Sequence, residues 1–285
     1  MAIDAARAAP ARDDGVHAMK RILTILAGLA LSASALAFDH GHRAWDELLR
    51  RHVRHVEGGN ASRVDYAGMA KDRAALAAVL GDYQKVARGE FDAWTKPQQQ
   101  AFLFNAYNAF TIEKILTRYP GIKSIRDFGT VFGNPWKDRF FTLFGQPAHL
   151  DRIEHEILRQ EGVYDDPRVH VAVVCASVGC PMLRNEAFVA DRLEAQLEDA
   201  LRRFLSDRTR NRYNPQSGKL EVSRIFDWYG KDFEKGHKGF SSVKQALSRY
   251  ADLLADRPAD RAIVKARQAE VSFLDYDWSL NDVNK

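Results

Sequence analysis

The sequence lacks the features that would assign it to several common functional classes. It has two cysteines in 285 residues, no glycine-rich phosphate-binding loop and no Gly-x-Ser-x-Gly elbow. It also has no internal repeats and no low-complexity linker. The net charge of +4 is small, and charges of both signs alternate, as in residues 231–235. These absences leave nucleotide binding, serine hydrolysis and nucleic-acid binding without support.

The N-terminal region is typical of a secretory signal peptide. A short basic start at 19–21 precedes an apolar stretch at 22–36, and 35–37 supplies small residues where signal peptidase cleaves. We expect cleavage after Ala37, with residues 1–18 as an upstream extension. The apolar stretch is too short for a comfortable membrane span, although an uncleaved anchor is the alternative. No similar stretch follows Phe38, so we expect an exported protein, periplasmic or secreted, without a stable span after cleavage.

The remaining residues, 38–285, suffice for one large domain or two small ones. The spacing of apolar residues predicts helices over 40–57, 71–87, 95–118, 151–160, 191–206, 225–233 and 242–254. Strands are expected over 140–143, 148–150, 168–174, 219–222 and 271–276. Because helices and short strands do not alternate regularly, we predict an α+β fold. It would be one helix-rich domain around a small sheet.

The helix predicted over about 95–118 has the clearest start signal in the chain. Thr95 fits the N-cap, Pro97 the first turn and Gln98 the capping-box position. Its apolar face is broad, so we expect this amphipathic helix to be central.

Both cysteines follow the apolar run at 168–174. Cys175 ends the run, and Cys180 lies beyond a loop of small residues. A buried strand that delivers a thiol to a loop is one way to present a reactive side chain. The same spacing suits a small structural disulfide loop, which an oxidising compartment favours.

A catalytic interpretation makes Cys175 a nucleophile, which needs a base at neutral pH. His155, on a separate predicted helix, can pack over the end of the strand. His170 lies five residues before Cys175 on the same predicted strand, and would face the opposite side unless the chain bends. We therefore expect His155 to be the better base.

Polar residues elsewhere could complete such a site. Glu154 either belongs to it or completes the helix cap begun by Asp151. Asn105 and Asn108 share a helix face, so one could orient an imidazole or stabilise an oxyanion, or both could bind loop backbone. The loop from Ser177 to Gly179 offers a hydroxyl and backbone amides for a small anion pocket.

Five separated motifs together resemble one family, DUF547. They lie at Phe104–Ala109, Leu150–Arg159, Asp166–Pro181, Ser223–Tyr229 and Tyr276–Asn281. The resemblance extends over about 64–281, and it implies a single DUF547-like domain of the kind found in many exported bacterial proteins and some plant proteins. The family brings no established reaction, so the chemistry has to come from the residues.

Three hypotheses follow from these residues. The first is an exported thiol hydrolase or acyltransferase in which Cys175 attacks and His155 or His170 moves the proton. Its chain order of Asn, His and Cys differs from that of papain. The second is a non-catalytic binding or interaction domain with a Cys175–Cys180 disulfide. The third is a zinc site of His155, His170, Cys175 and Cys180, although this spacing is not a usual zinc pattern. We predict no cofactor, and the partner is unknown.

Overall fold

The computed structural model describes residues 37–129 and 133–284. The predicted extension at 1–18 and the signal peptide at 19–37 lie outside the described residues, apart from Ala37. From Phe38 onward the chain forms one compact unit. A search of the described helices finds none with the length and apolar character needed to cross a membrane.

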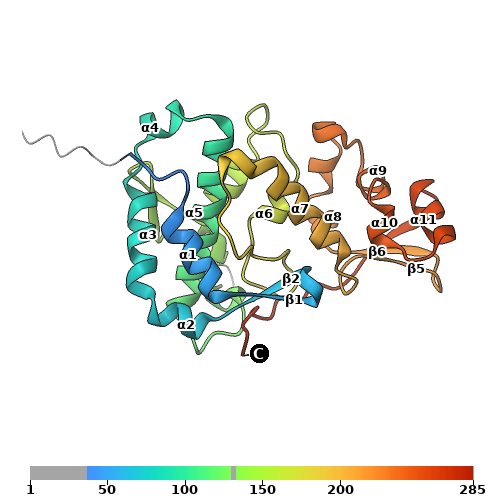
Figure 1. Ribbon diagram of the computed structural model, residues 1–285, viewed down its shortest axis with the longest axis horizontal. Coiled ribbons are helices and arrows are strands. Elements are labelled where there is room, and N and C mark those ends of the chain that lie inside the picture. The colour runs from blue at the N-terminus through green and yellow to red at the C-terminus, as the bar shows by residue number, and fades with distance from the viewer. Residues whose placement is uncertain (1–36, 130–132, 285) are drawn as a thin grey trace, which may run out of the picture. The chain divides into compact units, whose positions relative to one another are not determined.

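The prediction of a helix-rich α+β fold is confirmed (Figure 1). The helices are α1 (Arg43–His52), α2 (Tyr66–Lys71), α3 (Arg73–Lys85), α4 (Arg88–Ala93), α5 (Lys96–Leu116), α6 (Val169–Ala172), α7 (Leu193–Ser206), α8 (Ile225–Trp228), α9 (Val243–Ser248), α10 (Ala251–Leu254) and α11 (Pro258–Lys265). The short helical turns are η1 (Glu57–Gly59), η2 (Ile125–Phe128), η3 (Pro135–Lys137), η4 (Arg152–Leu158, a π-helix), η5 (Ala190–Arg192), η6 (Gly230–Phe233) and η7 (His237–Gly239).

The strands form three small sheets rather than one. They are β1 (Val53–Val56), β2 (Ala61–Val64), β3 (Phe141–Leu143), β4 (Gln146–Ala148), β5 (Arg212–Asn214), β6 (Lys219–Val222) and β7 (Glu270–Phe273). β1 pairs with β2 and β3 with β4, both antiparallel. In the third sheet β6 lies antiparallel to β5 and parallel to β7.

Helix α5 is the centre of the larger hydrophobic core. Its start has the predicted capping box, in which Thr95 and Gln98 bond each other's backbone N–H groups. Every residue from Ala101 to Ile112 is buried, which is the pattern of a core helix rather than of an amphipathic one. Figure 1 shows α5 between α3 and α6. Helix α7 packs its first half into this core and its second half into a smaller one around β6 and α10.

The strand predicted over 168–174 is wrong. Residues Val169–Ala172 form the single helical turn α6, and only the residues after it are extended. Asp166 helps to start the turn by accepting a hydrogen bond from the N–H of Arg168 at 2.9 Å. A continuous apolar run fits a buried helical turn as well as a buried strand, so its sequence carried no signal to separate them.

Other boundaries also differ from the predictions, among them the helix expected over 242–254, which is divided into α9 and α10. The first helix ends at His52 because the next residues form β1, whose Val53 pairs with Val64 of β2. The glycines at 58–59 therefore lie in a hairpin instead of ending a helix. Pro258, expected to mark only a break, begins α11, where the missing N–H of proline costs nothing.

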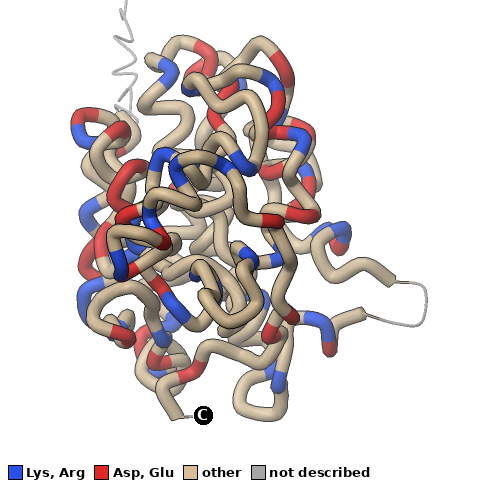
Figure 2. Tube along the Cα trace, turned by 90° about the vertical axis from the view of Figure 1, so that its right-hand side faces the viewer, with Lys and Arg blue, Asp and Glu red and all other residues tan. Residues whose placement is uncertain are grey.

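Charged residues of both signs are interspersed along the chain, as expected from the sequence (Figure 2). Many of them form ion pairs with one another, such as Arg168 with Asp166 and Glu194. The face shown in Figure 2 carries no stripe of a single sign.

Candidate functional site

The two cysteines form a disulfide in a tight loop that follows α6. The Cα atoms of Cys175 and Cys180 lie 6.3 Å apart, within the range that a disulfide spans. Cys175 is half-buried, whereas Cys180 is only 5% exposed. The loop turns at Ala176, whose φ of 61° is unusual for a residue with a side chain. Cys175 is thus the more accessible sulfur of the pair.

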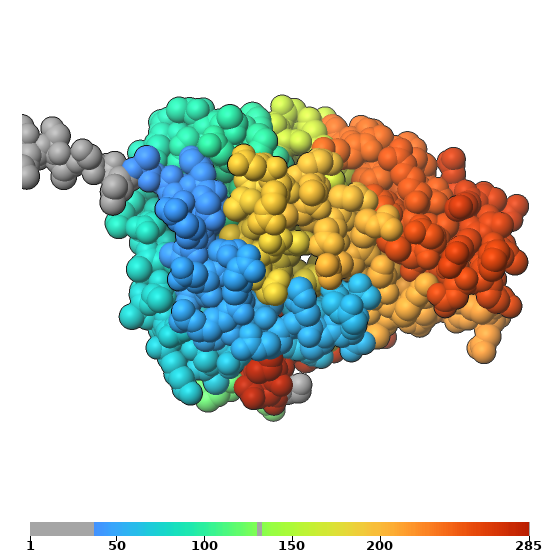
Figure 3. All heavy atoms as spheres, viewed as in Figure 1, coloured from blue at the N-terminus to red at the C-terminus, as the bar shows by residue number. Residues whose placement is uncertain are grey.

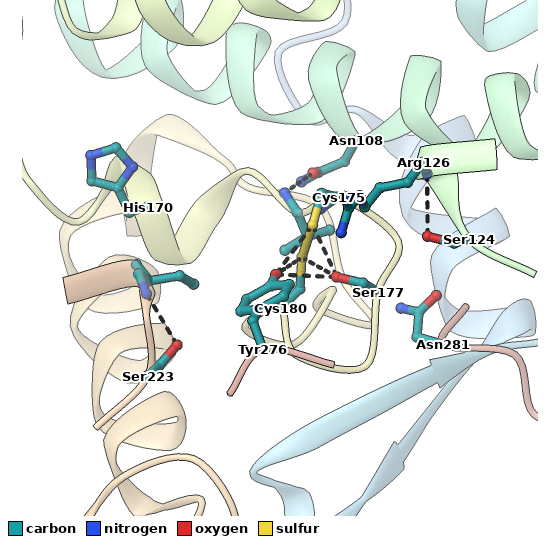
Figure 4. Close-up of a disulfide and its surroundings, with 12 residues drawn as sticks. Asn108, Ser124, Arg126, His170, Cys175, Ser177, Cys180, Ser223, Tyr276 and Asn281 are labelled. Atoms are coloured by element: carbon teal, nitrogen blue, oxygen red, sulfur yellow. Dashed lines mark hydrogen bonds between the residues drawn. A yellow bond between two sulfur atoms is a disulfide. The ribbon is translucent and has the colours of Figure 1, made fainter. Parts of the chain in front are cut away.

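Hydrogen-bond donors surround both sulfurs of the disulfide (Figure 4). The hydroxyls of Ser177 and Tyr276 lie 3.1 and 3.2 Å from Cys175 Sγ. The backbone N–H of Cys175 donates to Cys180 Sγ at 2.9 Å, and the Tyr276 hydroxyl lies 3.1 Å from that sulfur. The Ser177 hydroxyl donates to the Tyr276 oxygen at 3.1 Å and lies 3.4 Å from the same sulfur. Burial raises the pKa of Tyr276, so its hydroxyl keeps its proton and remains a donor.

The C-terminal segment holds Tyr276 against the cysteine loop. The N–H of Gly179 donates to the carbonyl of Asp277, and that of Val178 to the carbonyl of Ser279, both at 2.8 Å. A Cβ on Gly179 would lie 3.0 Å from backbone atoms of Asp277, so glycine permits this close contact. The amides of Val178 and Gly179, two of those predicted to bind an anion, are therefore used by the backbone of the C-terminal segment.

Residues of the cysteine loop line two pockets. The one that contains Gly179 is lined by Ser62, Arg63 and Arg210, and Figure 3 shows a hollow where the β1–β2 hairpin meets this region. The other contains the disulfide, and about 70 Å³ of it is accessible to the centre of a water-sized molecule. Its lining consists of Tyr107, Trp136, Glu154, His170, Val173, Cys175, Cys180, Pro181, Ile225, Trp228, Tyr229, Tyr276 and Trp278. We call this the disulfide pocket.

Aromatic rings form most of the wall of the disulfide pocket. Trp228 stacks on Trp278 with ring centroids 5.6 Å apart, and Tyr276 lies within 4.9 Å of both rings. Trp136 meets the edge of Trp278. Trp228 is nevertheless 44% exposed and is one of the exposed large hydrophobic side chains in the described part of the chain. A pocket of this kind, with few polar groups at its base, is typical of small-ligand sites.

His170 lies at the base of this pocket between two carboxylates. Its Nε2 lies 2.8 Å from Asp232 Oδ2, and its ring stacks on Tyr229 at 3.8 Å. Burial lowers the pKa of His170, which favours the neutral ring. We place the single proton on Nε2, because Asp232 accepts there. Nδ1 is then an acceptor, and it has no hydrogen-bond partner.

Glu154 faces that unpartnered nitrogen. Its Oε1 lies 3.8 Å from His170 Nδ1, and its Oε2 accepts a hydrogen bond from the Tyr107 hydroxyl at 3.0 Å. Asp151 makes no side-chain cap, and the N–H of Arg152 donates instead to Nδ1 of His149. The capping role considered for Glu154 is therefore wrong, and its carboxylate is turned into the protein.

His155, the expected base, lies outside the disulfide pocket. Its Nδ1 contacts Arg159 Nη1 at 2.5 Å, and its Nε2 lies 3.7 Å from Asp151. His170 shares the pocket with the disulfide instead. The expected preference rested on a strand at 168–174, and the helical turn α6 removes its basis.

Asn105 and Asn108 both bind backbone. Asn105 exchanges two hydrogen bonds with Phe188, at 2.8 and 3.0 Å. Asn108 donates to the carbonyl of Ala172 at 2.9 Å and accepts from the N–H of Val174 at 3.0 Å. It thus gives the segment before Cys175 the pair of bonds that a neighbouring strand would supply (Figure 4). Neither amide is left to orient an imidazole.

Two residues of the site were not expected from the sequence. Asp232 lies in a charged run that looked like solvated surface, and nothing local distinguishes it. Tyr276 belongs to a motif and was expected at the end of a strand, without a role. The four residues of the zinc hypothesis do not come together as ligands, because the two sulfurs are bonded to each other. In the described parts of the chain, no group of three or more His, Cys, Asp or Glu is arranged to hold a metal ion.

Comparison with known proteins adds a family but no activity. Residues 91–205 match the model of a family described as "Protein of unknown function, DUF547". No curated protein and no solved structure gives a match. The matched range contains α5, Glu154, His170 and the cysteine loop, whereas Asp232 and Tyr276 lie beyond it.

Proposed function

We propose that this chain, whose residues 91–205 match the DUF547 family model, performs thiol–disulfide exchange at Cys175–Cys180. The donors around the disulfide carry this proposal, because the N–H of Cys175 donates to Cys180 Sγ and the Tyr276 hydroxyl lies within hydrogen-bond distance of both sulfurs. Sulfur in a disulfide is a weak acceptor, whereas a thiolate is a strong one. The donors therefore suit the sulfur that leaves when the disulfide is opened.

The exchange begins at the more accessible sulfur. A substrate thiolate attacks Cys175 Sγ, the S–S bond breaks, and its electron pair passes to Cys180 Sγ. The thiolate formed there accepts hydrogen bonds from the N–H of Cys175 and from Tyr276, which Ser177 supports. The product is a mixed disulfide between substrate and Cys175.

A second substrate thiol completes the reaction. It attacks the substrate sulfur of the mixed disulfide, and Cys175 leaves as a thiolate that takes up a proton. Two thiols have then lost two electrons, and the protein disulfide has gained them. A small external disulfide reverses both steps and regenerates the oxidised protein, so it is the only oxidant needed.

Replacing Tyr276 by Phe tests the role of the donors. A hydrogen bond to a charged group contributes about 1.5–3 kcal/mol, so its loss should destabilise the reduced protein. We expect Tyr276→Phe to shift the equilibrium with glutathione about tenfold toward the disulfide, or about 30 mV more negative. The measurement is the alkylated fraction, by intact mass, in glutathione buffers of known ratio.

Tyr250→Phe is the matched control. Its hydroxyl bonds Glu198 at 3.1 Å and belongs to the smaller core, away from the sulfurs. That variant should titrate like the wild type. Equal midpoint potentials for Tyr276→Phe and the wild type would contradict the proposed stabilisation of the thiolate by the Tyr276 hydroxyl.

A thiol hydrolase or acyltransferase is the second candidate, for the reduced protein. His170 shares the pocket with Cys175, and its Nδ1 has no partner. In that function Cys175 would attack an acyl carbon, and His170, positioned by Asp232, would take the proton. Only the reduced form would then turn over an ester such as p-nitrophenyl acetate, and His170→Asn would abolish that activity but leave glutathione exchange in place.

The proposed exchange is consistent with export, which we keep as a proposal. An oxidising compartment would maintain the disulfide between cycles. The compact unit begins at Phe38, the residue after the predicted cleavage, and its ring packs between Trp94 and Phe102. N-terminal sequencing of exported protein should therefore read Phe38 first, whereas a start at Met1 or Met19 would contradict cleavage.

A further inference from the structure

Glu154 is a buried carboxylate that the hydroxyls of Tyr107 and Tyr229 hydrogen-bond, but it forms no ion pair with a lysine or arginine among the described residues. It is 6% exposed, and its only ion-pair distance within the described residues is to His170, whose burial favours the neutral ring. Arg159, the nearest candidate by sequence, is held by Asp232 at 2.7 Å and by His155. A charge buried without a partner is costly, and such charges in proteins are normally paired.

Two acceptors therefore face the same point at the base of the disulfide pocket. One is Glu154 Oε1, and the other is the unpartnered Nδ1 of His170, 3.8 Å away. The side chain of His170 is 1% exposed, and His170 lines the disulfide pocket together with Glu154. A group placed between these two atoms would have to be a hydrogen-bond donor, and a cationic donor would also neutralise the carboxylate.

The walls of the pocket suit the same kind of ligand. Tyr276, Trp228 and Trp278 contribute aromatic rings to the wall of the same pocket that Glu154 lines. The faces of aromatic rings attract cations, and cages of such rings with a carboxylate recognise ammonium groups. We propose that the disulfide pocket binds a primary amine, with its ammonium group between Glu154 and His170.

The amine site lies in the same pocket as the disulfide, and this position indicates the class of thiol that the exchange would use. Cys175 and Glu154 line one pocket, so an ammonium group at its base would leave the other end of a small molecule near the disulfide. The substrate of the exchange is then an aminothiol. This last step rests on the proposed function, whereas the amine site does not. The guanidinium of Arg126 lies 5.3 Å from the centre of the Trp278 ring. This cation would favour a thiol substrate with a negative charge over an aminothiol.

Amine binding is tested without any thiol. Phenethylamine and 2-phenylethanol have nearly the same shape, but only the first carries a charge at neutral pH. By calorimetry we expect the oxidised wild type to bind the amine at least about tenfold more tightly than the alcohol. Glu154→Gln should lose this preference. Glu156→Gln, which changes an exposed carboxylate in the same η4 segment, should keep it.

A second variant guards against a folding defect in Glu154→Gln. Trp228→Ala removes an exposed ring of the wall and should weaken amine binding without affecting the core. Equal binding of the amine and the alcohol by the wild type would overturn the proposal. A preference that persists in Glu154→Gln would do so as well.

The aminothiol is tested by reducing the protein with cysteamine and with 2-mercaptoethanol. Rates are corrected for thiolate content and divided by those for oxidised glutathione as a reference disulfide. We expect cysteamine to be favoured about tenfold by the wild type, but not by Glu154→Gln. Reduction by both thiols without this preference would overturn the aminothiol and leave the exchange intact. Amine binding without reduction by either thiol would keep the amine site but overturn the exchange, and the aminothiol with it.

Discussion

Cys180→Ser is expected to accumulate one stable mixed disulfide with glutathione, at Cys175. In the wild type Cys180 resolves such an adduct by re-forming the internal disulfide, so little of it should build up. Without Cys180, the thiolate of Cys175 attacks oxidised glutathione and releases one glutathione thiolate. The mixed disulfide then persists, because no second cysteine of the protein can attack it. Intact mass after incubation at neutral pH should show nearly complete conversion to a single adduct.

Cys175→Ser is the control for this experiment. Its remaining sulfur, on Cys180, is 5% exposed, so oxidised glutathione should modify it far more slowly. The difference between the two variants measures which sulfur meets the substrate. Equal rates of modification would contradict the assignment of Cys175 as the attacked sulfur and Cys180 as the leaving one.

Asn108→Ala is expected to destabilise the fold by about 3 kcal/mol. It would leave the carbonyl of Ala172 and the N–H of Val174 buried without partners, and each such loss costs about 1–3 kcal/mol. These two groups lie just before Cys175, so the same change should loosen the cysteine loop. Denaturant unfolding of the oxidised protein gives the free energy of unfolding directly.

The control is Asn60→Ala, at a half-exposed position in the β1–β2 turn. A change of this kind normally stays within about 0.5 kcal/mol. The comparison also separates the two roles considered for the asparagine pair. An Asn108→Ala protein as stable as Asn60→Ala would argue against its structural role and for a catalytic one.

Local signals predicted parts of this fold well. The capping box at Thr95 and Gln98 depends on residues three apart, and it marks the start of α5 correctly. The strand predicted over 140–143 contains β3, whereas the one predicted over 148–150 begins where β4 ends, because the turn takes up only Phe144 and Gly145. At Asp151 a similar pattern suggested a helix cap completed by Glu154, which does not form. His149 accepts the hydrogen bond from the N–H of Arg152 instead, and Glu154 faces the pocket.

The site depends on contacts between distant segments, which a single sequence does not reveal. Tyr276 reaches the sulfurs because residues 277–279 pair with 178–179, about a hundred positions earlier. His170 gains Asp232 from a run of charges that looked like ordinary surface. The cysteine loop itself was evident, since it holds both cysteines of the chain. The sequence does not show which side chains surround the cysteine loop, and these side chains determine its chemistry.

The midpoint potential of the Cys175–Cys180 pair tests the central claim most directly. The wild type would be equilibrated in glutathione or dithiothreitol buffers over a range of potentials, alkylated with iodoacetamide and weighed intact. Our account predicts a midpoint above about −270 mV, in the range of exchange-active proteins such as thioredoxin and the glutaredoxins. A midpoint below about −300 mV, where structural disulfides of secreted proteins lie, would contradict it.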